Sequence, residues 1–423
     1  MTRPTPEGAS PATGPTQLPW GPEDRSPLTP RPGGVTAVPE VRAAGVVAGL
    51  KDSGRPDLAL VDVGAVVPAA ATTTTNLVKA APCVVTERHL TDGTARAVVI
   101  NAGSANACTG ERGEEDALRT TREVGAALGC DPANVLPLST GLIGMPLPTE
   151  AIVAAIPQVV GSLGDDPADA DRAAEAITTT DTALKQVAFE VADEAGTCRI
   201  GGFAKGAGMI EPAMATMLAV LVTDAPLTSP VLRPMLAQAV QQSFNRISVD
   251  ACGSTNDTVV LLATGTATAP PGPEAVRTGL EAACGDLAHA IVADGEGTEK
   301  VAAVTVRGAP TESEADRLAR AITASTLFRA AVHGADPNWG RILAAMGAAG
   351  VPFDPRRVSV TCGGVMVCRF GTATVFDPGQ VGARLSRPEV TFEVDLHSGS
   401  HAVTHLTADL TAAYVAANAD YTT

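Results

Sequence analysis

Residues 205–225 read KGAGMIEPAMATMLAVLVTDA and join a glycine-containing loop to a wholly apolar segment. Thr216 follows the small residue Ala215, and the run from Met217 to Val222 predicts a buried strand. Cutting a chain before a threonine makes the α-amine of that threonine a base for its hydroxyl, and such an amine titrates near neutrality. The segment therefore indicates a masked nucleophile at Thr216 and a scissile bond between Ala215 and Thr216. A glycine-rich turn leading into a core strand explains the same residues without any chemistry.

The composition favours small-molecule chemistry. The chain has 423 residues, enough for two or three domains with sizeable cores. Its net charge is −16 and no cluster of Lys and Arg stands out, which argues against nucleic acid and anionic membranes as partners. The eight cysteines form no CxxC pair, and the sequence has neither a signal-peptide pattern nor an uncharged apolar run of about 18 residues. We therefore expect a cytoplasmic protein with reduced thiols.

The pattern along the chain separates a tail from globular parts. Residues 1–34 hold nine of the 32 prolines and almost no hydrophobic periodicity, which predicts a disordered tail. Short apolar runs alternate with helical stretches from Val35 onward. A new unit begins at about Val301, so we place a domain boundary near residue 305.

Several elements have clear end signals. Helices are predicted over Glu114–Leu128, which Gly129 closes, and over Val231–Phe244 and Pro273–Ala293. The last unit is expected to contain a strand from Val301 to Val306, a helix from about Ser313 to Val332, and hairpin-like strands around 358–370 and 390–410.

Three polar segments offer groups for acyl transfer. The stretch 139–144, STGLIG, follows an apolar run, so its backbone N–H groups and a hydroxyl can stabilise a tetrahedral oxyanion. The stretch 178–182, TTTDT, can bind a polar amino acid, and the turn 294–297, DGEG, can hold an ammonium with a carboxylate. A plain turn, a helix cap and an exposed acidic turn are the respective alternatives without function.

Metal and cofactor signals are weak. His397, His401 and His405 share parity, so on one continuous strand they would lie on one face, where they could bind zinc. The intervening Ser398-Gly399-Ser400 favours a hairpin turn instead, and we expect no metal site. Because the sequence has no Walker A loop, no GxGxxG after a strand, no HExxH and no GxSxG, we also expect no cofactor.

Taken together, these segments resemble the ornithine acetyltransferase family, also called glutamate N-acetyltransferases or bifunctional arginine-biosynthesis proteins. The resemblance extends from about Val35 to Thr423. It is carried, in order, by RAAGVVAGLK, NAGSANACTG, LSTGLIG, ITTTDT, AKGAGMIEPAMATMLA, SFNRISVD, STNDT, DGEGTEK, HGADPNWGRI and NADYTT. The nucleophile motif AKGxGMxxPxMAT is close to family-specific, whereas STG or DGEG alone is weak.

The resemblance implies an α/β fold: a self-processing sandwich similar to N-terminal-nucleophile hydrolases, with a smaller α/β C-terminal domain. Cleavage between Ala215 and Thr216 would give an α chain with core residues 35–215. The β chain would complete the core with residues 216–304 and form the C-terminal domain with residues 305–423. The two chains would stay together as an α2β2 heterotetramer.

The resemblance also implies the chemistry. The terminal Thr216 takes the acetyl group from N2-acetylornithine, releases ornithine and passes the acetyl group to glutamate in a ping-pong cycle that needs no coenzyme. Thr140 and Gly141 would form the oxyanion hole. The implied substrate-binding residues are Thr179, Lys205, Thr216, Glu296, Asn418 and Thr423. Lys205 suits a carboxylate and Glu296 suits an ammonium, and the use of acetyl-CoA as a second donor stays open.

The chain departs from the usual family pattern at several positions. Where SVDGDTSTNDT is common, it has SVDACGSTNDT, so Ala251, Cys252 and Gly253 replace Gly, Asp and Thr. Arg329 stands where Lys is usual, and Glu211 where Ala is often found. These departures keep two alternatives open. One is a secondary-metabolism paralogue acting on another N-acetyl amino acid, and the other is an unprocessed, non-catalytic homologue.

Overall fold

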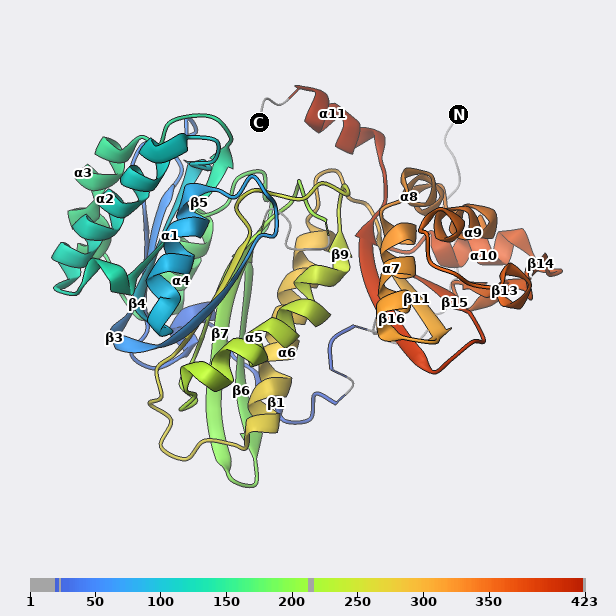
Figure 1. The fold of residues 1–423 in the computed structure, drawn as a ribbon, viewed down its shortest axis with the longest axis horizontal. Helices are drawn as coiled ribbons and strands as arrows, with labels where there is room; N and C mark the ends of the chain where they lie inside the picture. Colours follow the sequence, from blue (N-terminus) through green and yellow to red (C-terminus); the bar gives the residue numbers. More distant parts are fainter. Residues whose placement is uncertain (1–19, 23, 212–216, 421–423) are drawn as a thin grey trace, which may run out of the picture.

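The computed structural model describes residues 20–22, 24–211 and 217–420. Among these residues the strands form two sheets, one of nine strands and one of seven, with helices packed on both (Figure 1). The predicted α/β class is therefore confirmed. In Figure 1 the nine-stranded sheet and its helices occupy the left and centre, and the seven-stranded sheet lies on the right.

The nine-stranded sheet is built mainly from the first half of the chain. Its described strands are β1 (Leu28–Pro30), β2 (Arg42–Val46), β3 (Leu58–Thr73), β4 (Thr94–Ser104), β5 (Val135–Leu142), β6 (Lys185–Asp193), β7 (Gly196–Lys205), β8 (Leu218–Thr223) and β10 (Thr258–Ala263). Their order is β1-β6-β7-β8-β10-β3-β4-β5, with β2 also paired to β3. The pairs β8·β10 and β4·β5 are parallel, and β7·β8 and β10·β3 are antiparallel.

Strand β8 is buried on both faces of the sheet. All six of its residues are buried. Leu218, Val220 and Val222 belong to one apolar core and Ala219 and Leu221 to another, because side chains alternate along a strand. The buried strand predicted after Met217 is therefore confirmed.

Helices cover both faces of this sheet. The described helices are α1 (Ala81–His89), α2 (Gly110–Leu128), α3 (Thr149–Gly161), α4 (Pro167–Ala176), α5 (Ser229–Gln242) and α6 (Pro273–Ala293). Helix α4 packs on β2 and β3, whereas α6 packs on β6 and β7 and against α5. Short 3-10 helices occupy Gly34–Ala37, Leu90–Asp92, Pro132–Asn134, Phe244–Arg246 and Pro355–Arg357.

The seven-stranded sheet comes from the last third of the chain together with one short earlier strand. Its strands are β9 (Ile247–Ser248), β11 (Val301–Ala309), β12 (Ser359–Cys362), β13 (Val365–Arg369), β14 (Thr372–Ala373), β15 (Glu389–Asp395) and β16 (His401–Ala408). Their order is β14-β13-β12-β15-β11-β16-β9. Because β9 lies between α5 and β10 in the chain, its pairing with β16 joins the two parts of the molecule.

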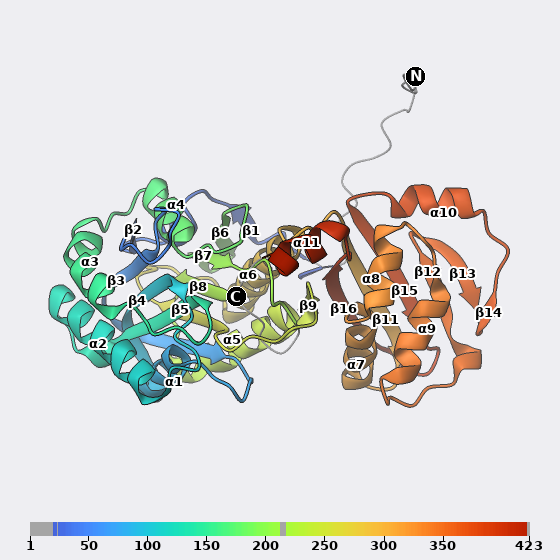
Figure 2. The ribbon, with the colours of Figure 1, turned by 90° about the horizontal axis from the view of Figure 1, so that it is seen from above.

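The remaining helices follow this second sheet. They are α7 (Glu312–Thr323), α8 (Thr326–His333), α9 (Trp339–Ala348), α10 (Pro378–Leu385) and α11 (Ala412–Asp420). Helix α11 leaves the end of β16 and lies between the two parts of the molecule when it is seen from above (Figure 2). Of the described helices, none is long and apolar enough to span a bilayer.

The predicted elements agree with the structure where local end signals exist. Helix α6 spans Pro273–Ala293 as predicted, and α2 ends at Leu128 with Gly129 in the left-handed conformation at φ 69°. The single helix predicted from Ser313 to Val332 is wrong, because the Ser325 side chain accepts from Phe328 N–H and starts α8 separately. The hairpin predicted for 390–410 is also wrong, because β11 lies between β15 and β16.

The N-terminal segment differs from its prediction as well. Leu28–Pro30 pair with β6, and Trp20 Nε1 donates to Gly285 O of α6 at 2.8 Å. Arg25 forms an ion pair of 2.7 Å with Asp286. Residues 28–30 are therefore ordered, and the prediction of disorder is wrong there because these contacts join parts of the chain that are far apart in sequence.

Candidate active site

A pocket lies where loops at one end of the nine-stranded sheet meet α11. Its volume is about 150 Å³. It brings together six of the predicted site residues, namely Thr140, Gly141, Thr179, Lys205, Glu296 and Asn418. The predicted residues Ala215, Thr216 and Thr423 lie outside the described residues.

The end of β5 forms one wall through a close approach of two backbones. Gly141 has φ 130°, and a Cβ added to it would lie 2.4 Å from the carbonyl carbon of Gly103. Glycine is therefore required where β5 meets β4. Asn256 Nδ2 donates to Ser139 O at 2.9 Å and fixes the strand just before Thr140. Thr140 and Gly141, the predicted oxyanion-hole residues, thus line the pocket on a strand end that its neighbours hold in place.

A buried charge network holds Lys205 at the end of β7. Lys205 Nζ donates to Thr179 Oγ1 at 2.8 Å and lies 3.9 Å from the Asp181 carboxylate. Burial lowers the pKa of Lys205 against the attraction of Asp181. Burial alone would raise the pKa of Asp181, but the ammonium groups of Lys205 and Lys185 hold it well below its usual range. An ammonium has three donors, so Lys205 keeps capacity for a ligand carboxylate.

Glu296 also lines the pocket. The Glu296 N–H donates to Ala207 O at 2.9 Å, which fixes the turn after α6 against the segment that follows β7. Asn418 Nδ2 of α11 donates to Glu296 Oε2 at 2.8 Å. Thr411 Oγ1 donates to Gly297 O at 2.8 Å just before that helix begins. The pocket is therefore lined by both a cationic group, Lys205, and an anionic group, Glu296.

The described chain resumes at Met217, just before β8. Leu218 pairs with Lys205 of β7 on one side and with Thr258 of β10 on the other. The Met217 N–H donates to Asp257 Oδ1 at 3.0 Å. The predicted nucleophile immediately precedes Met217 in the sequence, and the strand that follows it pairs with the end of β7 that carries Lys205.

Sequence reasoning did not assign the wall formed by residues 250–256. Asp250 accepts the N–H groups of Met209 at 2.5 Å, Ile210 at 2.8 Å and Cys252 at 3.1 Å, and burial raises its pKa to about 6. Cys252 lines the pocket, and Ala251 has φ 61°. The sequence signal that could have pointed to this wall is residues 251–253, ACG, which depart from the family pattern within a segment that otherwise resembles it.

Arg329 and Glu211, the two other residues that depart from the family pattern, contact elements next to the pocket without lining it. Arg329 is buried, donates from Nε to Ala408 O at 2.9 Å, and lies 5.9 Å from the ring centroid of Tyr414 in α11. Glu211 accepts from Ser248 Oγ at 2.9 Å and pairs with Arg320 at 3.0 Å. Arg329 thus fixes the start of α11, and Glu211 ties the segment before residue 212 to the seven-stranded sheet and its helix α7.

The three predicted histidines do not form a metal site. His397 lies in the turn before β16 with φ 47°, and its Nε2 contacts Ser359 Oγ at 3.1 Å. His405 is buried and bonds through Nε2 to Asp316 at 3.0 Å, whereas His401 is exposed. The turn that Ser398-Gly399-Ser400 predicted is the reason why His397 leaves the strand.

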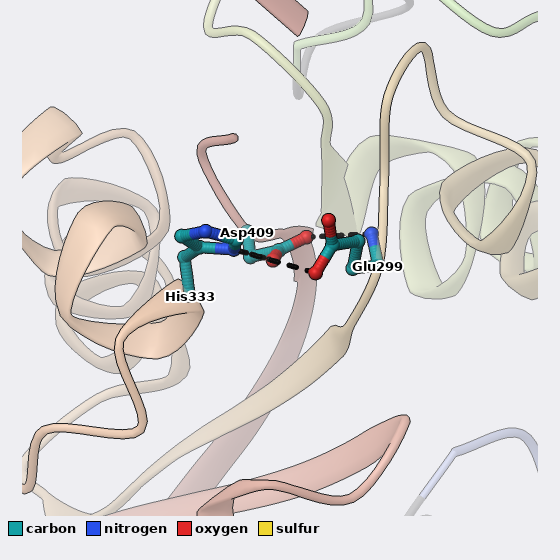
Figure 3. Close-up of side chains that lie close together, drawn as sticks. All are labelled: Glu299, His333 and Asp409. Atoms are coloured by element: carbon teal, nitrogen blue, oxygen red, sulfur yellow. Dashed lines mark hydrogen bonds and ion pairs between the residues drawn. The ribbon is translucent and has the colours of Figure 1, made fainter. Parts of the chain in front are cut away.

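A different group, Glu299, His333 and Asp409, does converge (Figure 3). Such ligand types hold divalent metals elsewhere. Here Asp409 Oδ2 already bonds His333 Nδ1 at 2.9 Å, and Oδ1 accepts the N–H groups of Glu299 and Lys300 at 2.9 and 3.0 Å. The Lys300 ammonium lies beside the group and donates to His333 O at 2.8 Å. We interpret the group as a clamp that fixes the start of β11 next to Glu296.

Comparison with known proteins identifies the class of this chain. A sequence model described as the ArgJ family matches residues 42–423. The chain therefore belongs to the ArgJ family. This confirms the family predicted from the motifs and, with it, the predicted class of enzyme, an acyltransferase.

Individual relatives extend over nearly the whole chain. The arginine biosynthesis bifunctional protein ArgJ of Thermosynechococcus vestitus is 44% identical over 415 residues, which cover 92% of this chain and 98% of that protein. The protein of the same name from Thermobifida fusca is 43% identical, covering 92% of this chain and 100% of that protein. A crystal structure of ornithine acetyltransferase complexed with ornithine, from Mycobacterium tuberculosis, is 44% identical with a TM-score of 0.41, covering 44% of this chain and 98% of that chain.

Proposed function

We propose that this chain cleaves itself between Ala215 and Thr216 and then transfers acetyl groups from N2-acetylornithine to glutamate, as a step of arginine biosynthesis. The observation that carries the proposal is the pocket that Lys205 and Glu296 line together, so that it presents one positive and one negative group to a ligand. An amino acid with a carboxylate and an ammonium matches that arrangement of charges.

In the first half-reaction the Thr216 hydroxyl attacks the acetyl carbon, and the free α-amine takes the hydroxyl proton. The oxyanion that forms is stabilised by the Gly141 N–H and the Thr140 hydroxyl. The C–N bond of N2-acetylornithine then breaks, the proton passes to the departing amine, and ornithine leaves an acetyl ester on Thr216.

In the second half-reaction the amine of glutamate attacks that ester. The C–O bond breaks, Thr216 Oγ regains its proton, and N-acetylglutamate is released. Lys205 with Thr179 binds a substrate carboxylate in both halves. Glu296, Asn418 and Thr423 complete the polar pocket, with Glu296 binding the side-chain ammonium of ornithine. No coenzyme takes part in this exchange.

The sheet supports a stable assembly after cleavage. The bond between residues 215 and 216 separates β7 from β8 in the chain, yet these strands pair from Ile200↔Thr223 to Lys205↔Leu218. The six residue pairs between β7 and β8, together with the pairing of β10 with β3, would therefore hold the α and β chains together without the covalent link. We further propose that the two chains form an α2β2 heterotetramer and that it works in the cytoplasm. Native mass measurement tests the subunit composition.

Acetyl transfer by the purified protein tests the proposal. Incubation with N2-acetylornithine and glutamate should yield ornithine and N-acetylglutamate, with parallel lines in double-reciprocal plots. Glu296→Gln should raise the KM for N2-acetylornithine, and Thr216→Ala should abolish transfer. A cleaved protein that transfers acetyl only from another N-acetyl amino acid contradicts the substrate and supports the paralogue. A separate arm with acetyl-CoA and glutamate tests for a second donor.

A further inference from the structure

Lys185, at the start of β6, holds a buried ammonium group between two carboxylates. Its side chain is 1% exposed, and its Nζ donates to Asp181 Oδ1 at 2.7 Å and to Asp294 Oδ2 at 2.5 Å. A third contact runs to the Ala183 carbonyl oxygen at 3.4 Å. An ammonium has three donors, so these contacts leave Lys185 none for a ligand. Lys185 is also not among the described residues that line the pocket. Any role in ligand binding therefore passes through its two carboxylates.

Asp181 connects this bridge to the cationic group of the pocket. Its Oδ1 accepts the Gly206 N–H at 2.7 Å, and its Oδ2 accepts the Thr179 N–H at 3.0 Å. Gly206 directly follows Lys205, and the Thr179 hydroxyl accepts from the Lys205 ammonium at 2.8 Å. Burial alone would raise the pKa of Asp181, but the ammonium groups of Lys205 and Lys185 hold it well below its usual range, so the carboxylate stays charged. Asp181 thus fixes the backbone on both sides of the contact that orients Lys205.

Asp294 connects the other end of the bridge to the anionic group of the pocket. It follows the last residue of α6 and stands two residues before Glu296 in the turn DGEG. Asp294 Oδ2 also accepts the Thr182 N–H at 3.0 Å, so the loop that carries Asp181 is bonded to this turn. The turn that presents Glu296 is therefore fixed to the loop that positions the cationic group, with Lys185 between the two carboxylates.

We propose that Lys185 is a positioning residue for substrate binding, which sets the separation between Lys205 and Glu296 and thereby selects ligands whose side chain ends in an ammonium. The inference rests on the proposed function, in which Lys205 binds the carboxylate and Glu296 binds the ammonium. A ligand of fixed length makes both contacts only at one separation. A ligand without the side-chain ammonium needs no such match. Desolvation largely offsets the attraction within a buried ion pair, so the bridge is a weak source of stability and acts on geometry.

Ornithine and norvaline test this inference, because they share one carbon chain and norvaline lacks the side-chain ammonium. Calorimetry on the purified protein gives both dissociation constants, and the ratio of the norvaline constant to the ornithine constant measures the selectivity. Lys185→Met should lower this ratio roughly tenfold, the value of one charge-assisted hydrogen bond. Asp294→Asn should lower it as well, because a neutral amide holds the Lys185 ammonium less firmly. The double variant should lower it no further than Lys185→Met, since both changes break the same link.

Arg96→Met is the matched control. Arg96 of β4 and Arg42 of β2 both pair with Asp62, whose side chain is fully buried, so this change also removes one of two cations from a buried carboxylate. Neither Arg96 nor Asp62 is among the described residues that line the pocket. The control should keep the selectivity of the wild type even where urea unfolding shows a comparable loss of stability. If Lys185→Met does not fold, Asp294→Asn carries the test, because its amide oxygen still accepts the Thr182 N–H.

The outcomes separate this inference from the proposed function. If the wild type binds ornithine more tightly than norvaline, but the folded bridge variants keep the ratio of Arg96→Met, Lys185 is only structural and the inference is wrong. If the wild type does not bind ornithine, or does not distinguish it from norvaline, the pocket does not recognise a side-chain ammonium and the proposed function fails first.

Discussion

Replacing Gly208 by alanine tests whether Glu296 binds a substrate ammonium. A Cβ added at Gly208 would lie 2.7 Å from Cδ, Oε1 and Oε2 of Glu296, whereas ordinary contact begins at 3.4 Å. The carboxylate must therefore move by about 0.7 Å. The obstructing atoms are the end of a flexible side chain, so we expect the free energy of unfolding to change by less than about 1 kcal/mol.

The effect should appear in substrate binding. A shift of this size disturbs the 2.8 Å bond from Asn418 Nδ2 and the position of the carboxylate toward a ligand. Loss of one charge-assisted hydrogen bond is worth about 1.5 kcal/mol, so the KM for N2-acetylornithine should rise roughly tenfold with little change in kcat.

Steady-state kinetics and urea unfolding, measured on the same preparations, separate an effect on substrate binding from an effect on stability. Gly161→Ala at the end of α3 is the matched control, because an added Cβ there has no described atom within 4 Å. An unchanged KM in Gly208→Ala would mean that Glu296 does not bind the substrate. A loss of several kcal/mol of stability would mean that the backbone, and not the carboxylate, needs the glycine.

Three further substitutions address the surrounding walls. Gly141→Ala places a methyl 2.4 Å from the Gly103 carbonyl carbon at φ 130°, so the free energy of unfolding measured in urea should fall by about 2–4 kcal/mol. Ala251→Gly removes the backbone strain of a non-glycine residue at φ 61°, so the free energy of unfolding should rise by about 1 kcal/mol in the same assay. Burial raises the pKa of Asp250 to about 6 in the folded protein, whereas its pKa in the unfolded chain is about 4. The contribution of Asp250 to the free energy of unfolding is therefore greatest below about pH 4 and is lost as the pH rises through the pKa of the folded state. The stability of the wild type relative to Asp250→Asn should thus fall by about 3 kcal/mol between about pH 4 and pH 7, and a difference that is constant with pH would refute this.

Local signals predicted the elements that carry them. Helix α6 was placed at its observed bounds because a turn with several prolines precedes it and a DG pair follows it. The buried strand β8 was evident from its uninterrupted apolar run. The position of β11 between β15 and β16 was missed, because pairing between distant strands leaves no mark in the pattern of either strand.

The candidate site divides in the same way. Thr179, Lys205, Glu296 and Asn418 were named through family motifs, and the structure places them around one pocket. Asp257 lies within the motif STNDT, yet only the three-dimensional arrangement reveals that one of its oxygens has no described partner. The contact of Arg329 with Tyr414 was likewise invisible, because it joins α8 to α11.

The central claim is that the chain processes itself to expose Thr216. The most direct test is the intact mass of the purified wild type beside that of Thr216→Ala. The account predicts two fragments that meet between Ala215 and Thr216 in the wild type and a single full-length chain in the variant. A wild type that stays at full length, while folded and incubated under the same conditions, would contradict it.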